Sequence, residues 1–124
     1  MANTGYETVS GRGATSVEDH TAGDTLTAAE SGTAHTNKGA GAAIVLALPV
    51  STKGMRFTFS VGAAQELRID PNGTEKVSLP STGVPGAAGK YLTADAIGET
   101  VSLVCFEAGI WGCVGYAGTW TAEA

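Results

Sequence analysis

Apolar and polar residues alternate with a period of two along several short stretches of the chain. The clearest stretch is residues 55–61, MRFTFSV, in which every second side chain is apolar: Met55, Phe57, Phe59 and Val61. A period of two places all of these side chains on one face of a β-strand, whereas a helix would scatter them around its axis. In residues 44–48, Ile44, Leu46 and Leu48 alternate with Val45 and Ala47, and Pro49, which cannot donate to a sheet, ends that run. Both stretches are predicted to be strands.

Residues 66–79, ELRIDPNGTEKVSL, contain two further alternating stretches separated by Pro71-Asn72-Gly73. Proline sets the negative φ of an early turn position, and Asn-Gly tolerates the positive φ that closes a tight turn. The pattern therefore predicts a β-hairpin. A calcium loop would need more oxygen ligands than this stretch supplies.

A last hairpin is predicted over residues 101–120, with Ala108-Gly109 in its turn. This register places Cys105 opposite Trp111 or Gly112, and Cys113 opposite Leu103 or Val104. The two cysteines are then offset along the strands, so we do not expect a disulfide between them.

Two segments before this hairpin are predicted to lack strands. Residues 93–98 are expected to form a short helical turn that Thr93 caps and Gly98 ends. Residues 80–91 contain two prolines and three glycines and are expected to form a long loop, which is a candidate interaction surface.

The N-terminal part of the chain has a different composition. The first 43 residues contain few large apolar side chains, chiefly Tyr6, Val9, Val17 and Leu26. Such a segment cannot form a core alone. We therefore predict an extended polar arm over residues 1–23 and a β-domain over residues 24–124. The fold class predicted is all-β: a small antiparallel β-sandwich or barrel of six to seven strands with an extended N-terminal arm.

Length and charge narrow the classes of partner. A chain of 124 residues fits one domain, and its 18 glycines suit short strands joined by many turns. Seven basic and twelve acidic residues give a net charge of −5 without charge runs, so nucleic acid is not expected as a partner. No stretch approaches the roughly 18 apolar residues of a membrane span, and no secretory signal is evident. We expect no membrane partner and synthesis in a cytoplasm.

Several C-terminal strand positions are apolar on both faces. Val101, Leu103 and Cys105 lie on one face of the predicted strand, and Val104 and Phe106 lie on the other. A small sheet that is apolar on both faces must be covered twice, and burial in an oligomer would provide the second cover. The residues expected at the subunit interface are Phe106, Trp111, Tyr116 and Trp120.

No constellation of catalytic residues is evident. His20 and His35 lie fifteen residues apart in the polar region with no cysteine near them, so both are expected to be solvated or contact residues, not metal ligands. No G-x-S-x-G motif is present, and the acidic residues fall in predicted turns or on exposed strand faces. The sequence predicts no enzyme, no catalytic residue, no cofactor and no metal site.

Three stretches carry a family resemblance: LTAAESGTAHTNKGAGAAIVLALP, TFSVGAAQELRIDPNGTEKV and LTADAIGETVSLVCFEAGIWGCVGYAGTW. Together they resemble a recurrent module of tailed-bacteriophage virion proteins, over roughly Asp24 to Thr121. The resemblance implies an all-β, non-enzymatic structural module that tends to be trimeric. Such modules occur in capsid decoration (cement) proteins and in fibre or spike tips.

The short polar N-terminal segment favours a decoration protein, since a fibre usually carries a long stalk or repeats before such a module. We therefore expect a head decoration protein on the capsid exterior of the virion. It would act as a homotrimer, with the major capsid protein as partner. The arm residues expected to contact the capsid are Tyr6, Val9, Val17 and Leu26. The alternative is a tail fibre or spike tip module that binds host-surface glycan or receptor through residues 80–91 and exposed aromatic side chains.

Overall fold

The computed structural model describes residues 15–124, and this part of the chain is built almost entirely of short strands. The strands are β1 (Val17–Asp19), β2 (Asp24–Thr25), β3 (Thr33–Thr36), β4 (Ile44–Ala47), β5 (Arg56–Ser60), β6 (Leu67–Asp70), β7 (Lys76–Val77), β8 (Leu92–Ala94), β9 (Thr100–Glu107), β10 (Ile110–Ala117) and β11 (Thr121–Ala122). One three-residue 3-10 helix, η1 (Ala28–Glu30), follows β2. The all-β class is confirmed. None of the described residues forms a helix long and apolar enough to cross a membrane.

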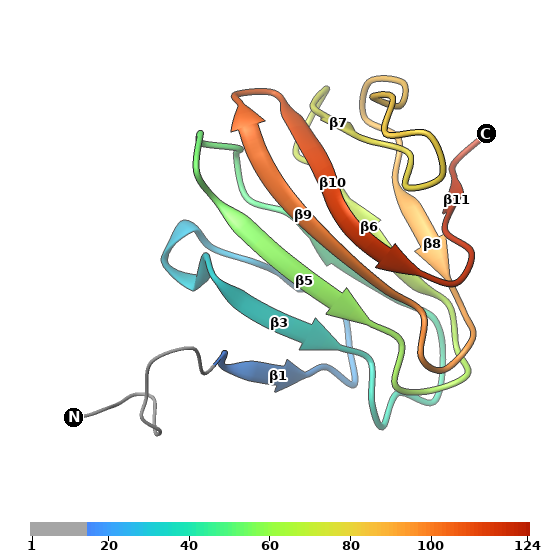
Figure 1. Ribbon diagram of the computed structural model, residues 1–124. Coiled ribbons are helices and arrows are strands. Elements are labelled where there is room, and N and C mark those ends of the chain that lie inside the picture. The colour runs from blue at the N-terminus through green and yellow to red at the C-terminus, as the bar shows by residue number, and fades with distance from the viewer. Residues whose placement is uncertain (1–14) are drawn as a thin grey trace.

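The strands form two sheets that lie one in front of the other (Figure 1). The six-stranded sheet has the order β1-β3-β5-β9-β10-β7, and the five-stranded sheet has the order β11-β8-β6-β4-β2. Both sheets are mixed. The runs β1-β3-β5 and β2-β4-β6 are parallel, whereas β5-β9-β10 and β6-β8-β11 are antiparallel. The prediction of an antiparallel fold with six or seven strands is therefore wrong.

The parallel runs have a simple cause in the path of the chain. From β1 to β9, each strand lies in the opposite sheet to the strand before it. In the runs β1-β3-β5 and β2-β4-β6, neighbours in a sheet are therefore two strands apart along the chain, and the chain crosses to the other sheet between them. Among the described residues, the β9–β10 pair is the hairpin between consecutive strands.

The segment 66–79 is a sheet-to-sheet corner, not the predicted hairpin. Its two strands exist, but β6 belongs to the five-stranded sheet and β7 pairs with β10 in the other sheet. The turn itself is present: Gly73 has φ 55°, and the Glu75 amide donates to the Asn72 carbonyl over 3.0 Å. Proline and Asn-Gly permit a reversal, but they do not determine whether the second strand returns to the same sheet.

The segments on either side of β8 also differ from expectation. Thr93 lies within β8, and the turn that follows ends at Gly98 with φ 97°, so no helical turn begins at Thr93. Within residues 80–91, Gly86 N–H donates to the Val77 carbonyl over 3.0 Å, and Gly89 N–H donates to the Glu75 carbonyl over 2.9 Å. This loop is bonded back onto the β7 segment.

The predicted C-terminal hairpin is confirmed. Cys105 is paired with Trp111, and Cys113 is paired with Leu103, so the two cysteines are offset as expected. Both are free thiols.

One apolar core fills the space between the sheets. It draws alternate residues from both sheets: Leu26, Ala40, Ile44, Leu46, Leu48, Phe57, Phe59, Val61, Leu67, Ile69, Val77, Leu92, Ala94, Val101, Leu103, Cys105, Trp111 and Trp120. The predicted inward faces of residues 44–48 and 55–61 are confirmed, with Met55 only partly buried. Each large side chain that is fully buried contributes roughly 1.5–3 kcal/mol by removal from water.

β-Structure begins within the segment predicted to be an arm. β1 pairs in parallel with β3, with Glu18 aligned to His35, and the His20 amide donates to the Thr36 carbonyl over 2.9 Å. Sequence patterning gave no sign of this pairing, because β1 has only three residues and its partner lies far along the chain.

Candidate functional site

Two buried histidines meet at the edge of the core, beside β1 and β3. His20 is 5% exposed and His35 is 1% exposed. His20 Nε2 lies 2.9 Å from His35 Nδ1, and the His35 ring also packs against the rings of Phe57 and Phe59. The expectation that both histidines are solvated or contact residues is wrong, because the parallel pairing of β1 with β3 turns both rings inward.

The hydrogen bonds around His35 determine which nitrogen carries its proton. Thr33 Oγ1 donates its single hydrogen to the Glu30 carbonyl over 2.7 Å. Its 2.7 Å contact with His35 Nε2 therefore requires the ring N–H to donate to Thr33. The other ring nitrogen, Nδ1, then presents its lone pair to His20. Neutral His35 is a hydrogen-bond acceptor on this side.

Burial and charge keep His35 in that neutral form. Burial is the largest cause of its lowered pKa, and the neighbouring His20 lowers the pKa further. The carboxylates of Glu30, Glu18 and Asp24 act in the opposite direction without reversing the shift. A neutral imidazole is the form that binds metal ions.

Two carboxylates complete the surroundings of the histidine pair. Glu18 Oε1 lies 3.7 Å from His20 Nε2 and 3.8 Å from His35 Nδ1. Glu18 reaches both rings because it is the register partner of His35, so the two side chains share a face of the sheet. Asp24 Oδ2 lies 3.9 Å from the other His20 nitrogen, Nδ1. Donor atoms of Glu18, His20 and His35 all lie within 4.8 Å of one another, so this cluster could hold a metal ion.

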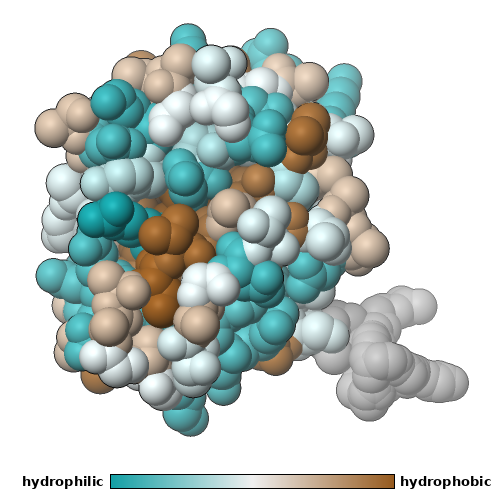
Figure 2. All heavy atoms as spheres, turned by 180° about the vertical axis from the view of Figure 1, so that it is seen from behind, coloured by the Kyte–Doolittle hydropathy of each residue, from teal (hydrophilic) through white to brown (hydrophobic). Residues whose placement is uncertain are grey.

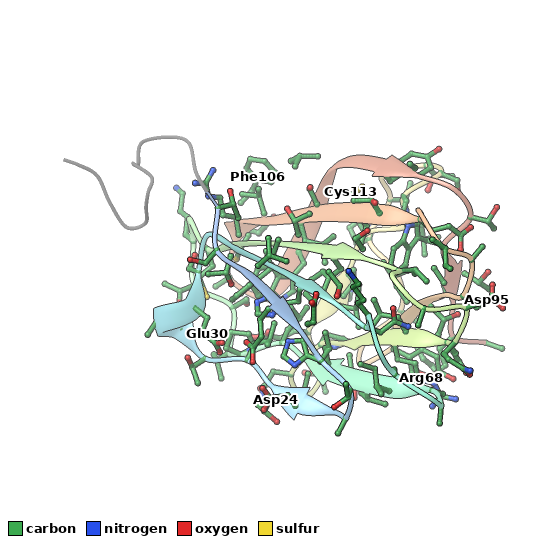
Figure 3. All side chains as sticks on the ribbon, turned by 90° about the horizontal axis from the view of Figure 1, so that it is seen from below. Asp24, Glu30, Arg68, Asp95, Phe106 and Cys113 are labelled. Atoms are coloured by element: carbon green, nitrogen blue, oxygen red, sulfur yellow. The ribbon has the colours of Figure 1, made fainter. Side chains whose placement is uncertain are left out.

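The cluster lies at one side of the molecule. In Figure 3, the labelled Asp24 and Glu30 mark this side, and Cys113 lies across the molecule from them. Sequence reasoning missed the cluster because fifteen residues separate the histidines. The available signal was the spacing of Glu18 and His20, which places both on one face if residues 17–20 are extended.

A second feature is the apolar surface on the outer face of the six-stranded sheet. Phe106 is 62% exposed, and its ring lies against Gly112, where an added Cβ would come within 2.9 Å of Phe106 Cδ2. Val104 is paired with Gly112 and shares this face, and Val114 is 54% exposed nearby on β10. We call Val104, Phe106 and Val114 the outer strip. Figure 1 shows β9 and β10, which carry the strip, in the front sheet.

A shallow hollow of about 220 Å³ borders the outer strip. Its lining includes Arg56, Thr58 and Ser102 on β5 and β9, together with Val104 and Val114 of the strip. The two hydroxyl groups at its floor, on Thr58 and Ser102, lie 3.0 Å apart. Neither histidine lines this hollow.

The structure separates the four residues predicted at the subunit interface. Trp111 and Trp120 are 0% and 8% exposed and belong to the core of the protomer, so their indoles are not available to another subunit. Trp120 also donates from Nε1 to the Thr100 carbonyl over 3.0 Å. Phe106 and Tyr116 are both at least half exposed.

The predicted arm residues are similarly divided. Val17 is 62% exposed on β1, whereas Leu26 is buried in the core and is not available to contact a capsid. Leu26 is buried because its amide donates to the Ala47 carbonyl and continues the pairing of β2 with β4. Tyr6 and Val9 lie outside the described residues.

The opposite face of the molecule carries polar side chains and a group of hydrophobic side chains near its middle (Figure 2). On the outer side of β6, Arg68 pairs with Glu66 over 3.0 Å and lies over the Tyr91 ring at 4.6 Å from its centre. Grouped apolar side chains on a surface are typical of an interface, and the outer strip is such a group.

Comparison with known proteins identifies no relative. No family model matches the chain, and no curated protein matches it.

Proposed function

We propose that the protein is a bacteriophage head decoration protein. It binds the outer capsid surface as a homotrimer and stabilises contacts between neighbouring major capsid subunits. The observation that carries the proposal is the outer strip: an exposed phenylalanine and two valines on a sheet whose other face already packs on the core. Apolar side chains grouped on a rigid surface are typical of subunit contacts. The trimeric state and the capsid as partner are implied by the resemblance to phage virion modules.

The edge of the six-stranded sheet supports contact with a second copy of the chain. β7 pairs only with Ile110 and Trp111 of β10, so on the side away from β9 the rest of β10, through Ala117, has no described strand beside it. An open edge offers unpaired backbone groups to another chain. The outer strip lies on β9 and β10, and the open edge belongs to β10, so one neighbouring subunit could cover both.

We propose that the N-terminal segment of the chain contacts the capsid. β1 is the outermost strand of its sheet, and Val17 on it is exposed. Tyr6 and Val9 remain predicted capsid contacts. Three such segments on one trimer would combine modest affinities through their high effective concentration.

A tail fibre or spike tip that binds host glycan is the second candidate. The hollow beside the outer strip favours it, since Arg56 and the hydroxyl groups of Thr58 and Ser102 could hydrogen-bond to a sugar. Two observations weigh against it. The indoles of Trp111 and Trp120 are buried and cannot stack on a sugar ring, and the loop 80–91 is bonded back onto β7.

The experiment is an add-back assay on virions from which the protein has been removed with mild denaturant. We expect the purified chain to return to the shell in hundreds of copies per particle, counted by cryo-electron microscopy. A few copies at the tail, or binding to host glycan instead, would support the fibre candidate.

A deletion of residues 1–14 tests the role of the N-terminal segment. This boundary keeps β1 and the buried His20, which a deletion through residue 23 would remove. We expect the shortened chain to keep its melting temperature and its trimer but to lose capsid occupancy. Occupancy equal to that of the full chain would contradict the assignment.

A further inference from the structure

We propose that Glu18, His20 and His35 bind one divalent transition-metal ion, with zinc the best match, where β1 meets β3. The three donor atoms are His20 Nε2, His35 Nδ1 and Glu18 Oε1, separated by 2.9, 3.7 and 3.8 Å. In a tetrahedral zinc site with bonds of roughly 2.1 Å, ligand atoms lie about 3.4 Å apart. Small movements of these side chains would therefore bring all three donors to bonding distance of one ion.

The far nitrogen of His35 already makes the hydrogen bond expected at a metal site, and the far nitrogen of His20 lies near a carboxylate. His35 Nε2 donates to Thr33 Oγ1, which in turn donates to the Glu30 carbonyl. His20 Nδ1 faces Asp24 Oδ2 at 3.9 Å. Histidines that bind metals almost always donate their second N–H to such an acceptor, which orients the ring and fixes the tautomer.

Metal binding would replace the hydrogen bond between the two rings. Without metal, His20 donates from Nε2 to the His35 Nδ1 lone pair. With metal, His20 Nε2 and His35 Nδ1 both point their lone pairs at the ion. The His20 proton is then on Nδ1, and this N–H donates a hydrogen bond to the Asp24 carboxylate. His35 keeps its Nε2 proton, which it donates to Thr33 Oγ1.

The donor set selects the class of ion. Two imidazole nitrogens and one carboxylate suit zinc and the neighbouring first-row metals, whereas calcium and magnesium prefer oxygen ligands throughout. Thiolates do not complete the site: Cys113 lies across the molecule, and the Cys105 thiol contacts the Glu107 carbonyl at 3.1 Å (Figure 3). The Glu18 side chain is 51% exposed, so the cluster is open to water on that side.

A bound ion would cross-link the N-terminal edge strand to the body. β1 is held to β3 by a parallel pairing of only three residues. Glu18 and His20 lie on or directly after β1, and His35 lies on β3, so one ion would join the two segments through side chains. The ion would thereby hold β1 against β3 through side chains as well as through backbone pairing.

The test measures zinc binding by the full, untagged chain after treatment with chelator. We expect isothermal titration calorimetry to give one zinc per chain, no response to magnesium, and a melting temperature raised by several degrees. Cobalt added instead of zinc should give visible bands without thiolate-to-metal charge transfer. Strong charge-transfer bands would show that the cysteines bind the metal and would overturn the proposal.

Two variants and a matched control locate the site. Glu18→Gln and His35→Gln should each weaken zinc binding by at least about tenfold, since each removes a ligand. Asp19→Asn is the matched control for Glu18→Gln: it removes the same charge one residue along β1, on the opposite face of the strand. This variant should bind zinc like the original chain. Glu18 is half exposed, so its variant should fold even if His35→Gln does not. Equal affinity in Glu18→Gln and Asp19→Asn, or no binding by the original chain, would overturn the proposal.

Discussion

Glu99 shows how one carboxylate can hold two turns together. Its Oε2 accepts from the Thr119 amide over 2.7 Å, and its Oε1 accepts from the amides of Ala96 and Asp95 over 3.0 and 3.2 Å. Gly118, with φ 80°, lies so close to this side chain that an added Cβ would collide with it. The carboxylate therefore joins the turn before β9 to the turn after β10.

These bonds predict a pH dependence of stability. The backbone amides of Thr119 and Ala96 are the main causes of the lowered Glu99 pKa. A lowered pKa in the folded state adds stability above the unfolded-state pKa of about 4.3, and this stability is lost as the pH falls through the folded pKa. We expect Glu99→Gln to lower the free energy of unfolding at neutral pH by up to about 1 kcal/mol, because water screens a partly exposed group.

Urea titrations over a falling pH series would measure this effect. The difference between the original chain and Glu99→Gln should shrink as the pH falls, because the protonated carboxyl also loses its charge-assisted bonds. A constant difference at every pH would mean that shape, not charge, accounts for the loss.

At the scale of elements, Asn37 joins two connections that are far apart in sequence. Its Oδ1 accepts from the amides of Gly62 and Ala63, and its Nδ2 donates to the carbonyls of Ala63 and Gln65. Asn37 is fully buried, so these four bonds have no competition from water. They hold the connection after β3 against the connection after β5.

Replacing Asn37 by alanine should therefore be costly. The change leaves backbone groups of residues 62–65 without partners, and we expect a loss of about 3 kcal/mol in the free energy of unfolding. Asn72→Ala is the matched control, because Asn72 is exposed in the corner between β6 and β7. Chemical denaturation would compare the two variants, and similar midpoints would show that the Asn37 bonds are not a major source of stability.

The sequence pattern predicted an element correctly where the alternation or the turn residues lay within that element. The alternation in residues 55–61 located β5 and its buried face, and Ala108-Gly109 located the β9–β10 turn with the correct register. Connectivity between sheets was not predictable in this way. Pro71-Asn72-Gly73 has the same local chemistry whether the following strand pairs with its predecessor or crosses to the other sheet.

The histidine cluster was missed for a related reason. Glu18, His20 and His35 converge only because β1 pairs in parallel with β3, and β1 is too short to show a period. Burial was also misjudged for Trp111 and Trp120. Alternation shows which residues share a face, but whether another sheet or another subunit covers that face depends on the arrangement of the whole chain.

At the scale of the whole molecule, the outer strip is the surface expected to form the contact between subunits of the proposed trimer. Phe106 is largely exposed, and its neighbours on this face are Val104 and Val114. If these side chains form the seam of a trimer, Phe106→Lys should place a charge in an apolar contact and weaken association. We expect a loss of about 2 kcal/mol or more per seam, as for a central aromatic contact, and dissociation to monomers at micromolar concentration.

Sedimentation equilibrium of Phe106→Lys would test this expectation against Ile97→Lys. Ile97 is 68% exposed in the turn before β9, so its variant introduces the same charge at a similarly exposed site outside the strip. Both variants should keep the fold of the protomer, because neither side chain belongs to the core. Loss of the trimer in Phe106→Lys alone would place the seam at the outer strip. A trimer that survives in both variants would exclude the strip as the seam, and the open edge of β10 would then be the next surface to substitute.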